Sequence, residues 1–458
     1  MDSGMARAEV QLHDKGFTPS VEASASIAMG AAGVAAGTAI QLFAYWVTKS
    51  YRWVLWLLLT KPLVDLAWRW TFVETAYQVI NLQAVVGIAA LILNGTAVLF
   101  KPLDKRLPRS VLIFLFCATA SVVFSPSSEG LNEILRLLAG AMFFYTAGPL
   151  LADRIRFARY AKALLLVGAI PVVLTYFQAA GILPFDYFDW IDHAALGRGS
   201  GTYPTPLNLV YLLIYMVPLG LYLTCKEIHT AAVRWMAWLF LAAAFVALAF
   251  TYHRAGYIAV ALQVLLWFYL SRGRRSAAAL FLALALLAAI SSERLGTLFD
   301  RTVISGVGEV DEHFLRGRGF QWILFLQSYY SSGPIHWLIG NGGSIIAGLD
   351  PLDAEIDANE PHSDYIRILH AYGLVGFGLY VSMLFQFFRK AIRRLGDPDA
   401  FPRAVARIVL VVLVAVVLLS ITTEPMRYPS AVWYLFALVS ALYCVERPSE
   451  PVREAAGA

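Results

Sequence analysis

Charged side chains are scarce in this sequence. Asp, Glu, Lys and Arg make up 15% of its 458 residues, whereas hydrophobic residues make up 59%. A soluble protein of this length carries far more charge, so the composition excludes that class and indicates a polytopic membrane protein. Backbone polar groups in lipid must be satisfied within the spanning segment, so the expected fold class is all-α. The net charge of +5 fits cytoplasmic loops rich in Lys and Arg, and we expect no nucleic-acid binding.

Cysteine is also rare, and the placement of the three cysteines excludes a disulfide-stabilised protein and a cysteine metal site. Cys117, Cys225 and Cys444 lie inside apolar runs, without the spacing of a disulfide framework or a metal site. We interpret them as packing residues. The first 26 residues are polar and mixed and contain no evident cleavable signal peptide, so we interpret them as a cytoplasmic tail. No internal repeat is evident.

Long apolar runs dominate the rest of the chain. A membrane span needs about 20 apolar residues, and by this criterion the sequence predicts twelve transmembrane helices. These cover residues 52–69, 79–100, 110–124, 131–151, 160–181, 206–225, 234–251, 255–271, 277–291, 366–388, 405–421 and 430–445. An Ala- and Gly-rich segment at 27–47 is either a thirteenth span or an interfacial helix. We favour the interfacial helix because twelve spans fit the charge pattern better.

The basic segments predict which loops face the cytoplasm. Clusters at 101–109, 153–162, 272–275 and 389–394 fall in alternate loops, and the positive-inside rule makes all four cytoplasmic. Both termini are then cytoplasmic as well. The expected organisation is a cytoplasmic or interfacial N-terminal segment (1–50), nine spans (51–291), a large periplasmic loop (292–365), three spans (366–446) and a cytoplasmic tail (447–458).

The large loop is too long to be a mere connector. Within it, residues 319–332 have the pattern of an amphipathic helix that lies on the membrane. Residues 338–344, LIGNGGS, form a cluster of glycine turns. The acidic run at 350–360 could bind a divalent cation, but a solvated loop is the better interpretation because metal cages have tighter oxygen spacing.

Three predicted external loops carry a cation or a histidine close to the membrane. They contain Arg198 in ALGRGSGTYP, Arg254 in TYHRAGY, and His362 with Asp364 and Arg367 in PHSDYIR. Charges at membrane depth are costly and usually line a cavity or bind a ligand. Arginine is suited to multidentate contact with phosphate. The three loops therefore suggest a site for an anionic lipid head group, most simply a diphosphate.

Each of these residues also has a structural interpretation. Arg254 is equally consistent with an interfacial residue whose guanidinium reaches the head groups. Arg198 fits a solvated position in a glycine-rich loop. His362 fits a bystander at the start of a helix that Ser363 or Asp364 caps.

Lys61 and Asp65 stand four residues apart within the first predicted span. That spacing places both side chains on one side of a helix. We interpret them as a structural ion pair inside the membrane.

The segment HSDYIRILHAYGLVG resembles the signature of the O-antigen ligase and O-antigen polymerase superfamily, through His362, Ser363, Gly373 and Gly376. These are bacterial inner-membrane glycosyltransferases of the GT-C type. Arg318, followed by FQW and LIGNGG, is similar to the family's large-loop segment, and GTYPTPLNLVYLL to the segment that opens the span after the third external loop. YHRAGYIA resembles the family's serine-arginine-glycine turn, with histidine in place of the serine and alanine in place of the glycine. The resemblance covers about residues 180–380.

The resemblance implies that a glycan is transferred from undecaprenyl diphosphate to a hydroxyl of an acceptor sugar, at a site facing the periplasm. His362 and Arg254 would be catalytic, with His362 as general base. Arg198, Arg254 and Arg318 would bind the diphosphate and stabilise the developing charge. Arg367, Asp364, Gly373 and Gly376 would support the site. Direct attack would invert the anomeric centre. No metal and no other cofactor are expected.

Three functions remain open on the sequence. The histidine and glycine spacing is nearest to the ligase pattern, in which a finished polymer moves onto lipid A-core. An O-antigen or exopolysaccharide polymerase would use the same class of donor and a lipid-linked repeat unit as acceptor. A transporter of a lipid-linked glycan is the third alternative, although the missing repeat symmetry and the long loop argue against it.

Overall fold

The structure is a computed structural model. It describes residues 52–67, 71, 73–74, 79–80, 82–100, 107–183, 199–203, 205–226, 228–273, 318–343 and 361–445. The described elements are helices apart from one short strand pair. The helices are α2 (Arg52–Leu66), α3 (Leu82–Phe100), α4 (Ser110–Phe124), α5 (Ser128–Thr146), α6 (Gly148–Leu151), α7 (Arg154–Ala179), α8 (Pro206–Leu223), α9 (Ala231–Phe250), α10 (Arg254–Arg272), α13 (Arg318–Ser331), α14 (Pro334–Ile339), α15 (Asp364–Arg394), α16 (Ala400–Thr422), the 3-10 helix η4 (Pro425–Arg427) and α17 (Pro429–Cys444).

The apolar runs do form helices, as predicted. Most predicted spans coincide with one helix. The exceptions are 79–100, whose first two residues are in a strand, 131–151, which is divided between α5 and α6, and 277–291, which lies outside the described residues. Six described helices are long and apolar enough to cross a membrane, and α3, α4 and α17 contain shorter apolar stretches. The chain is therefore an α-helical membrane protein. The count of twelve spans and the interfacial helix at 27–47 stay predictions.

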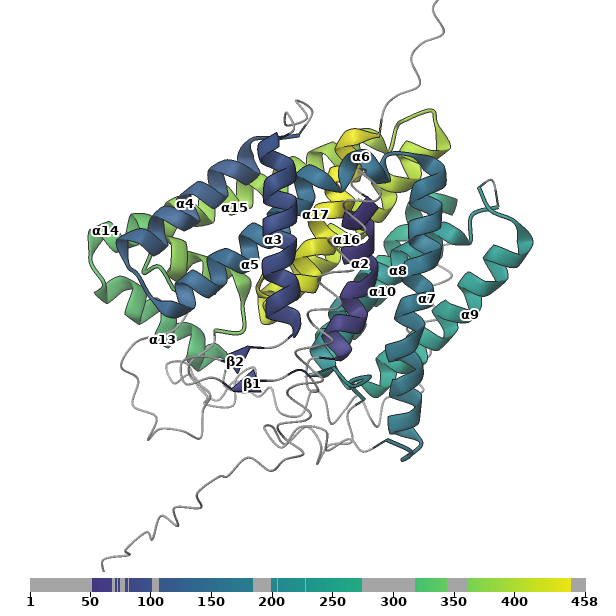
Figure 1. Ribbon diagram of the computed structural model, residues 1–458, viewed down its shortest axis with the longest axis horizontal. Helices are drawn as coiled ribbons and strands as arrows, with labels where there is room; N and C mark the ends of the chain where they lie inside the picture. Colours follow the sequence, from purple (N-terminus) through teal and green to yellow (C-terminus); the bar gives the residue numbers. More distant parts are fainter. Residues whose placement is uncertain are drawn as a thin grey trace, which may run out of the picture.

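Long helices run back and forth between two ends of the bundle (Figure 1). The polar end, as we call it, is formed by the turns at 125–127, 199–203, 251–253, 361–363 and 423–428. Bonds across it join turns that are distant in sequence: Gly199 N donates to Phe250 O at 2.8 Å, and Asp364 N donates to Thr423 O at 3.2 Å. These turns belong to the loops that the charge pattern predicts to be external.

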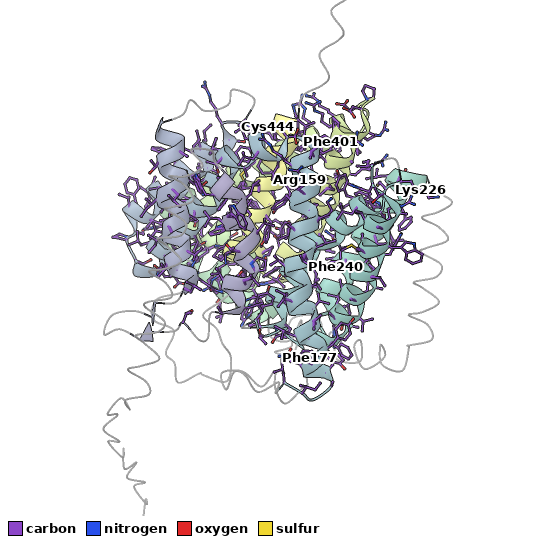
Figure 2. The ribbon with its side chains drawn as sticks, turned by 45° about the vertical axis from the view of Figure 1, so that its right-hand side comes forward. Arg159, Phe177, Lys226, Phe240, Phe401 and Cys444 are labelled. Atoms are coloured by element: carbon purple, nitrogen blue, oxygen red, sulfur yellow. The ribbon has the colours of Figure 1, made fainter. Side chains whose placement is uncertain are left out.

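The opposite end carries many of the described Arg and Lys residues, and we call it the basic end. It is formed by the turns at 107–109, 152–153, 224–226 and 395–399. Arg159 and Lys226 lie at this end with Phe401 and Cys444, whereas Phe177 lies at the other (Figure 2). Asp153 Oδ1 caps α7 by accepting from Arg156 N at 2.8 Å. The distribution of charge agrees with the predicted alternation of loops.

Three helices form the centre of the bundle. The side chains of α8 and α17 are almost all buried, and most of those of α16 are buried too. Gln263 on α10 fixes this packing, because its Nε2 donates to Ile214 O at 2.8 Å and to Val411 O at 3.3 Å. On α2, Lys61 and Asp65 form the predicted buried ion pair, and the Lys61 ammonium lies 5.3 Å from the ring centroid of Trp433.

Two local features differ from the sequence interpretation. Residues 73–74 (β1) pair antiparallel with residues 79–80 (β2), so a strand occupies the first two residues of the predicted span 79–100. The tenth predicted span is not one continuous helix: Gly373, with φ 65° and ψ −171°, breaks α15. Only glycine adopts this backbone conformation readily, which explains why the break occurs there.

Candidate functional site

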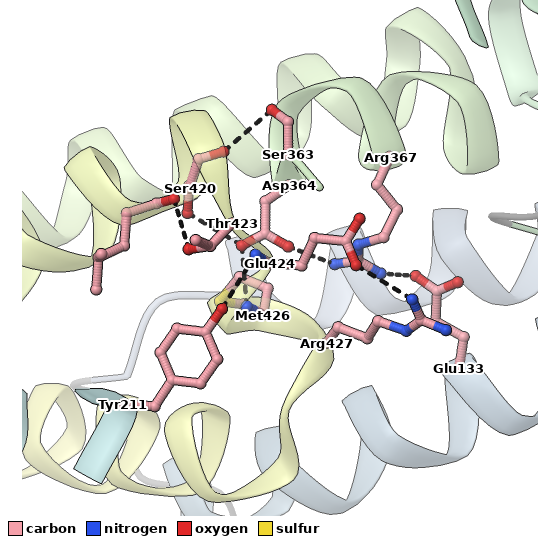
Figure 3. Close-up of polar contacts among 11 residues, drawn as sticks. Glu133, Tyr211, Ser363, Asp364, Arg367, Ser420, Thr423, Glu424, Met426 and Arg427 are labelled. Carbon is pink, nitrogen blue, oxygen red and sulfur yellow. Dashed lines mark hydrogen bonds and ion pairs between the residues drawn. The ribbon is translucent and has the colours of Figure 1, made fainter. Parts of the chain in front are cut away.

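A buried ion network lies where α15 begins. Arg367 is fully buried and forms ion pairs with Glu133 on α5 and with Asp364, whose Oδ1 is 2.8 Å from Arg367 Nη2. The other Asp364 oxygen accepts from Met426 N at 2.9 Å and from Ser420 Oγ at 3.0 Å (Figure 3). Asp364 and Arg367 therefore support the site in a specific way: they tie the start of α15 to α5, α16 and η4.

A second set of charges continues the network toward the surface. Glu424 is buried, and its Oε2 lies 3.2 Å from Arg427 Nη1. Arg427 Nη2 lies 3.4 Å from Glu129 Oε1, and both of these side chains are partly exposed. Tyr211 on α8 joins the set by accepting a hydrogen bond from Glu424 N at 3.1 Å. The network is thus fully buried around Arg367 and partly exposed at Arg427 and Glu129.

Carboxylates outnumber guanidinium groups in this network. Glu129, Glu133, Asp364 and Glu424 face Arg367 and Arg427, so the fully ionised set would carry excess negative charge. Two buried oxygens, Glu133 Oε2 and Glu424 Oε1, have no hydrogen-bond partner among the residues that the structure describes. Both terminal nitrogens of Arg367 bond to carboxylates, so this guanidinium holds the network together.

His362 immediately precedes the network. It is partly buried and has φ 47°, in the left-handed region that non-glycine residues seldom occupy. Pro361 O, next to it, accepts from Trp322 Nε1 of α13 at 2.8 Å. Ser363 occupies the N-cap position without capping the helix, and its hydroxyl donates instead to Ser420 O at 3.1 Å. The expected capping is therefore wrong for Ser363, and the His362 backbone is fixed by contacts on both sides.

Arg254 begins α10 after a turn of only a few residues. His253 is the N-cap, and its Nδ1 accepts from Gly256 N at 3.1 Å. Gly256 packs closely against Val210 on α8, next to the tyrosine that bonds to Glu424. Arg254 itself is partly buried. Through α8, the start of α10 is connected to the same ion network that holds His362 in place.

The structure describes less of the two remaining predicted arginines, Arg198 and Arg318. Arg198 lies outside the described residues, and its neighbour Gly199 bonds to the last residue of α9, four positions before Arg254. Ser200 N and Gly201 N both donate to Gln178 Oε1 at 2.9 Å, which holds that loop against α7. The backbone of Arg318 begins α13, the helix that bonds to Pro361. The acidic run at 350–360, which we interpret as a solvated loop, is also outside the described residues.

Backbone strain marks the same three loops. Among the described residues, the non-glycine residues with positive φ are Thr202 at 68°, Tyr252 at 50° and His362 at 47°. Each lies in one of the external loops that carry the predicted diphosphate-binding or catalytic residues. Such conformations cost about 1–3 kcal/mol each and persist where surrounding contacts impose them, often at functional sites.

Gly373 and Gly376 support the site through backbone approach. A Cβ on Gly373 would collide with Leu338 O, and the residue lies against the 338–340 backbone of the large loop. Gly376 lies against Tyr372 and within reach of Cys117 Sγ, at 3.8 Å from the position of a Cβ. Of the two glycines, Gly373 therefore allows another segment to approach α15 closely, and that segment belongs to the large loop.

The sequence interpretation missed several members of this site. Glu133, Glu424 and Arg427 were not singled out, nor was His370, which is 2% exposed on α15. The sequence feature that could have identified these residues is that they are charged or titratable and lie inside or directly beside apolar runs. What the sequence does not give is which of these charges pair, because the partners come from separate helices.

The fold and the network define a polytopic α-helical membrane protein with a polar, strained site at one end of its bundle. No protein-family model matches the chain, and no curated protein matches it. Within the described residues, no group of three or more His, Cys, Asp or Glu side chains is placed to hold a metal ion.

Proposed function

We propose that this protein is a bacterial inner-membrane glycosyltransferase that moves a glycan from undecaprenyl diphosphate to an acceptor sugar hydroxyl, as an O-antigen ligase does. The observation that carries the proposal is that three strained residues at the polar end, Thr202, Tyr252 and His362, each lie in one of the loops singled out by sequence. The ligase's acceptor would be lipid A-core, and the site would face the periplasm.

In the proposed reaction, the acceptor hydroxyl attacks the anomeric carbon of the donor. The bond between that carbon and the diphosphate oxygen breaks, and undecaprenyl diphosphate leaves with the electron pair. His362 takes the hydroxyl proton as a neutral imidazole. Arg254, together with Arg198 and Arg318, stabilises the negative charge that grows on the diphosphate. Attack opposite the leaving group inverts the anomeric centre.

The buried network serves this chemistry by holding the loops. Arg367 and Asp364 fix the first turn of α15, and therefore the position of His362, two residues before Asp364. A reacting group must be held in a narrow range of geometry, and misplacement by 1 Å can cost about a hundredfold in rate. This role explains why buried charges, which are costly to remove from water, lie next to a histidine.

The direct test is a transfer assay with purified protein in lipid nanodiscs, a defined lipid-linked donor and candidate acceptors. His362→Ala and Arg254→Ala should each abolish transfer while expression and insertion stay normal. His336→Ala is the matched control, because the side-chain bond of His336 within the described part of the chain is local, between Nδ1 and Gly340 O at 3.1 Å. Near-normal transfer by either of the first two variants would remove that residue from the mechanism.

Two further measurements separate the alternatives. EDTA should leave transfer unchanged, and a strict dependence on Mg²⁺ or Mn²⁺ would instead direct attention to the acidic run at 350–360. In a deletion strain, lipid-linked polymer should accumulate while lipid A loses its long chains. Accumulation of single repeat units would identify a polymerase, and uptake of a lipid-linked glycan without covalent transfer would identify a transporter.

A further inference from the structure

His370 is a buried histidine that the proposed mechanism does not use. It lies on α15, and both of its ring nitrogens have partners outside that helix. Nδ1 is 3.1 Å from Gly343 O, while Nε2 is 3.1 Å from Asn341 Nδ2 and 3.4 Å from Ser328 Oγ. A carbonyl oxygen can only accept, so Nδ1 carries the proton. Nε2 is then the acceptor for the amide and the hydroxyl, and the neutral ring satisfies all three bonds.

These bonds attach α13 to α15 at a second point. Ser328 lies near the end of α13, and Phe325, one turn earlier, packs its ring edge-on against His370 with centroids 5.1 Å apart. The first point of attachment is the bond from Trp322, near the start of α13, to Pro361. Two attachments along one helix fix its direction as well as its position. They therefore fix the backbone of Arg318, at the start of α13, relative to His362.

The turn at 341–343 fills the break in α15. Asn341 N donates to His370 O at 2.9 Å, and Gly342 N donates to Ala371 O at 3.0 Å. Ser121 Oγ on α4 donates to the same Ala371 oxygen at 2.6 Å. These bonds satisfy carbonyl groups that lose their helical partners at Gly373. Because they involve the backbone, they remain when the His370 side chain is changed, and a variant at this position should still fold.

We propose that His370 is a positioning residue for the glycosyl transfer, which holds the arginine-bearing helix α13 in register with the base at the start of α15. The proposal rests on the proposed function. His370 contacts neither donor nor acceptor in this scheme. It acts through α13 and the 341–343 turn, and its loss should lower the rate of the chemical step more than the affinity for substrates.

Three substitutions separate the effect of the hydrogen bonds made by the His370 ring nitrogens from the effect of the packing of the ring. His370→Phe keeps an aromatic ring and removes both polar attachments. His370→Asn keeps a donor in the region of Nδ1 and should retain the bond to Gly343 O. His336→Phe is the matched control on α14, since the ring of that histidine bonds, among the residues that the structure describes, to Gly340 O in its own turn.

The first readout is geometric and needs no enzymatic activity. Spin labels at Gln327→Cys on α13 and Phe385→Cys on α15, both exposed positions, report the relation of the two helices after Cys117, Cys225 and Cys444 are replaced by serine. His370→Phe should broaden or shift the distance distribution, His370→Asn should do so less, and His336→Phe should leave it unchanged. An unchanged distribution in His370→Phe would overturn the proposal.

The second readout is the transfer reaction. His370→Phe should lower kcat by about tenfold to a hundredfold while KM stays within about threefold, and His370→Asn should recover most of the loss. A shifted distribution with wild-type kcat would overturn the positioning role. Absence of transfer by the wild-type protein, with every acceptor supplied, would count against the proposed function alone, because the spin-label result still decides whether His370 fixes α13.

Discussion

The two ends of the bundle use the same kinds of residue in opposite ways. At the polar end, Arg367 is fully buried between two carboxylates, and the turns include non-glycine residues with positive φ. At the basic end, Arg393 is exposed, and helices begin with ordinary caps such as Asp399, which accepts from Phe401 N at 3.0 Å. Among the described residues, the non-glycine residues with positive φ all lie at the polar end, and so do the fully buried pairs of Arg367. The basic end has an ion pair too, between Arg394 and the buried Asp397, but it is confined to one turn of chain. The comparison indicates that the backbone geometry at the polar end is held by several contacts at once.

The largest expected difference between the ends concerns arginine removal. Arg367→Ala leaves Glu133 and Asp364 buried without their cation, and removal of one partner from a buried pair costs about 3–5 kcal/mol. Arg393→Ala, at an exposed position of the same helix, should change the free energy of unfolding by less than about 0.5 kcal/mol. Unfolding of both variants in mixed micelles, followed by circular dichroism, measures the difference.

One further variant shows whether the effect comes from unpaired charge. Arg367→Ala combined with Glu133→Gln removes one of the orphaned carboxylates and should recover part of the loss. Equal stability of Arg367→Ala and Arg393→Ala would mean that the network contributes nothing to the distinction between the ends.

Two glycines on α15 allow the strained backbone near the polar end to be compared with regular helix. Gly373→Ala would place a side chain at φ 65° and ψ −171° and against Leu338 O, so it should destabilise the protein by about 1–3 kcal/mol from the backbone conformation alone. Gly378→Ala, five residues along, meets nothing within 4 Å and should stabilise the helix by about 0.5–1 kcal/mol. Thermal unfolding of the two variants in detergent is the measurement. Changes of the same sign would contradict a break confined to Gly373.

The smallest effect is expected at the basic end and depends on pH. Burial, followed by the nearby charges of Lys162 and Arg154, lowers the pKa of His229 from 6.5 to about 4. The unfolded chain therefore takes up a proton before the folded one does. The stability contributed by neutral His229 is complete above pH 6.5 and is lost as the pH falls toward 4. Because the side chain is partly exposed, the loss should stay below about 1 kcal/mol.

His229→Gln removes this titration. Its melting temperature should fall less than that of the wild type between pH 7.5 and pH 4.5, measured in the same detergent. An equal fall in both proteins would assign the acid sensitivity to other groups, such as the carboxylates of the polar end.

Much of the architecture could be predicted from the sequence because lipid imposes a strong rule on composition. Runs of apolar residues had to become helices, and the basic clusters indicated which turns share an end. The Lys61–Asp65 pair was predictable because four residues make one helical turn. Each of these inferences uses only residues that are close in sequence, or a property summed over a whole segment.

The site was predictable only in its parts. The loops of Arg254 and His362 were identified, but the network below them was not, because Glu133, Arg367 and Glu424 lie on segments far apart in the chain. The break at Gly373 was missed for a related reason. A glycine inside an apolar run is compatible with a continuous helix, and the conformation it adopts depends on the large-loop segment that packs against it.

The interruption of α15 has a mechanical consequence. Residues 374–388, which precede the basic cluster at 389–394, extend about 22 Å, less than the thickness of about 30 Å of the hydrocarbon layer. The outer part of α15, residues 364–372, is therefore needed to complete the span. Because the break at Gly373 divides this span into two segments, the packing of the 338–343 segment against the break sets the direction of the outer segment, and a substitution in that packing should turn the outer segment without changing the inner one.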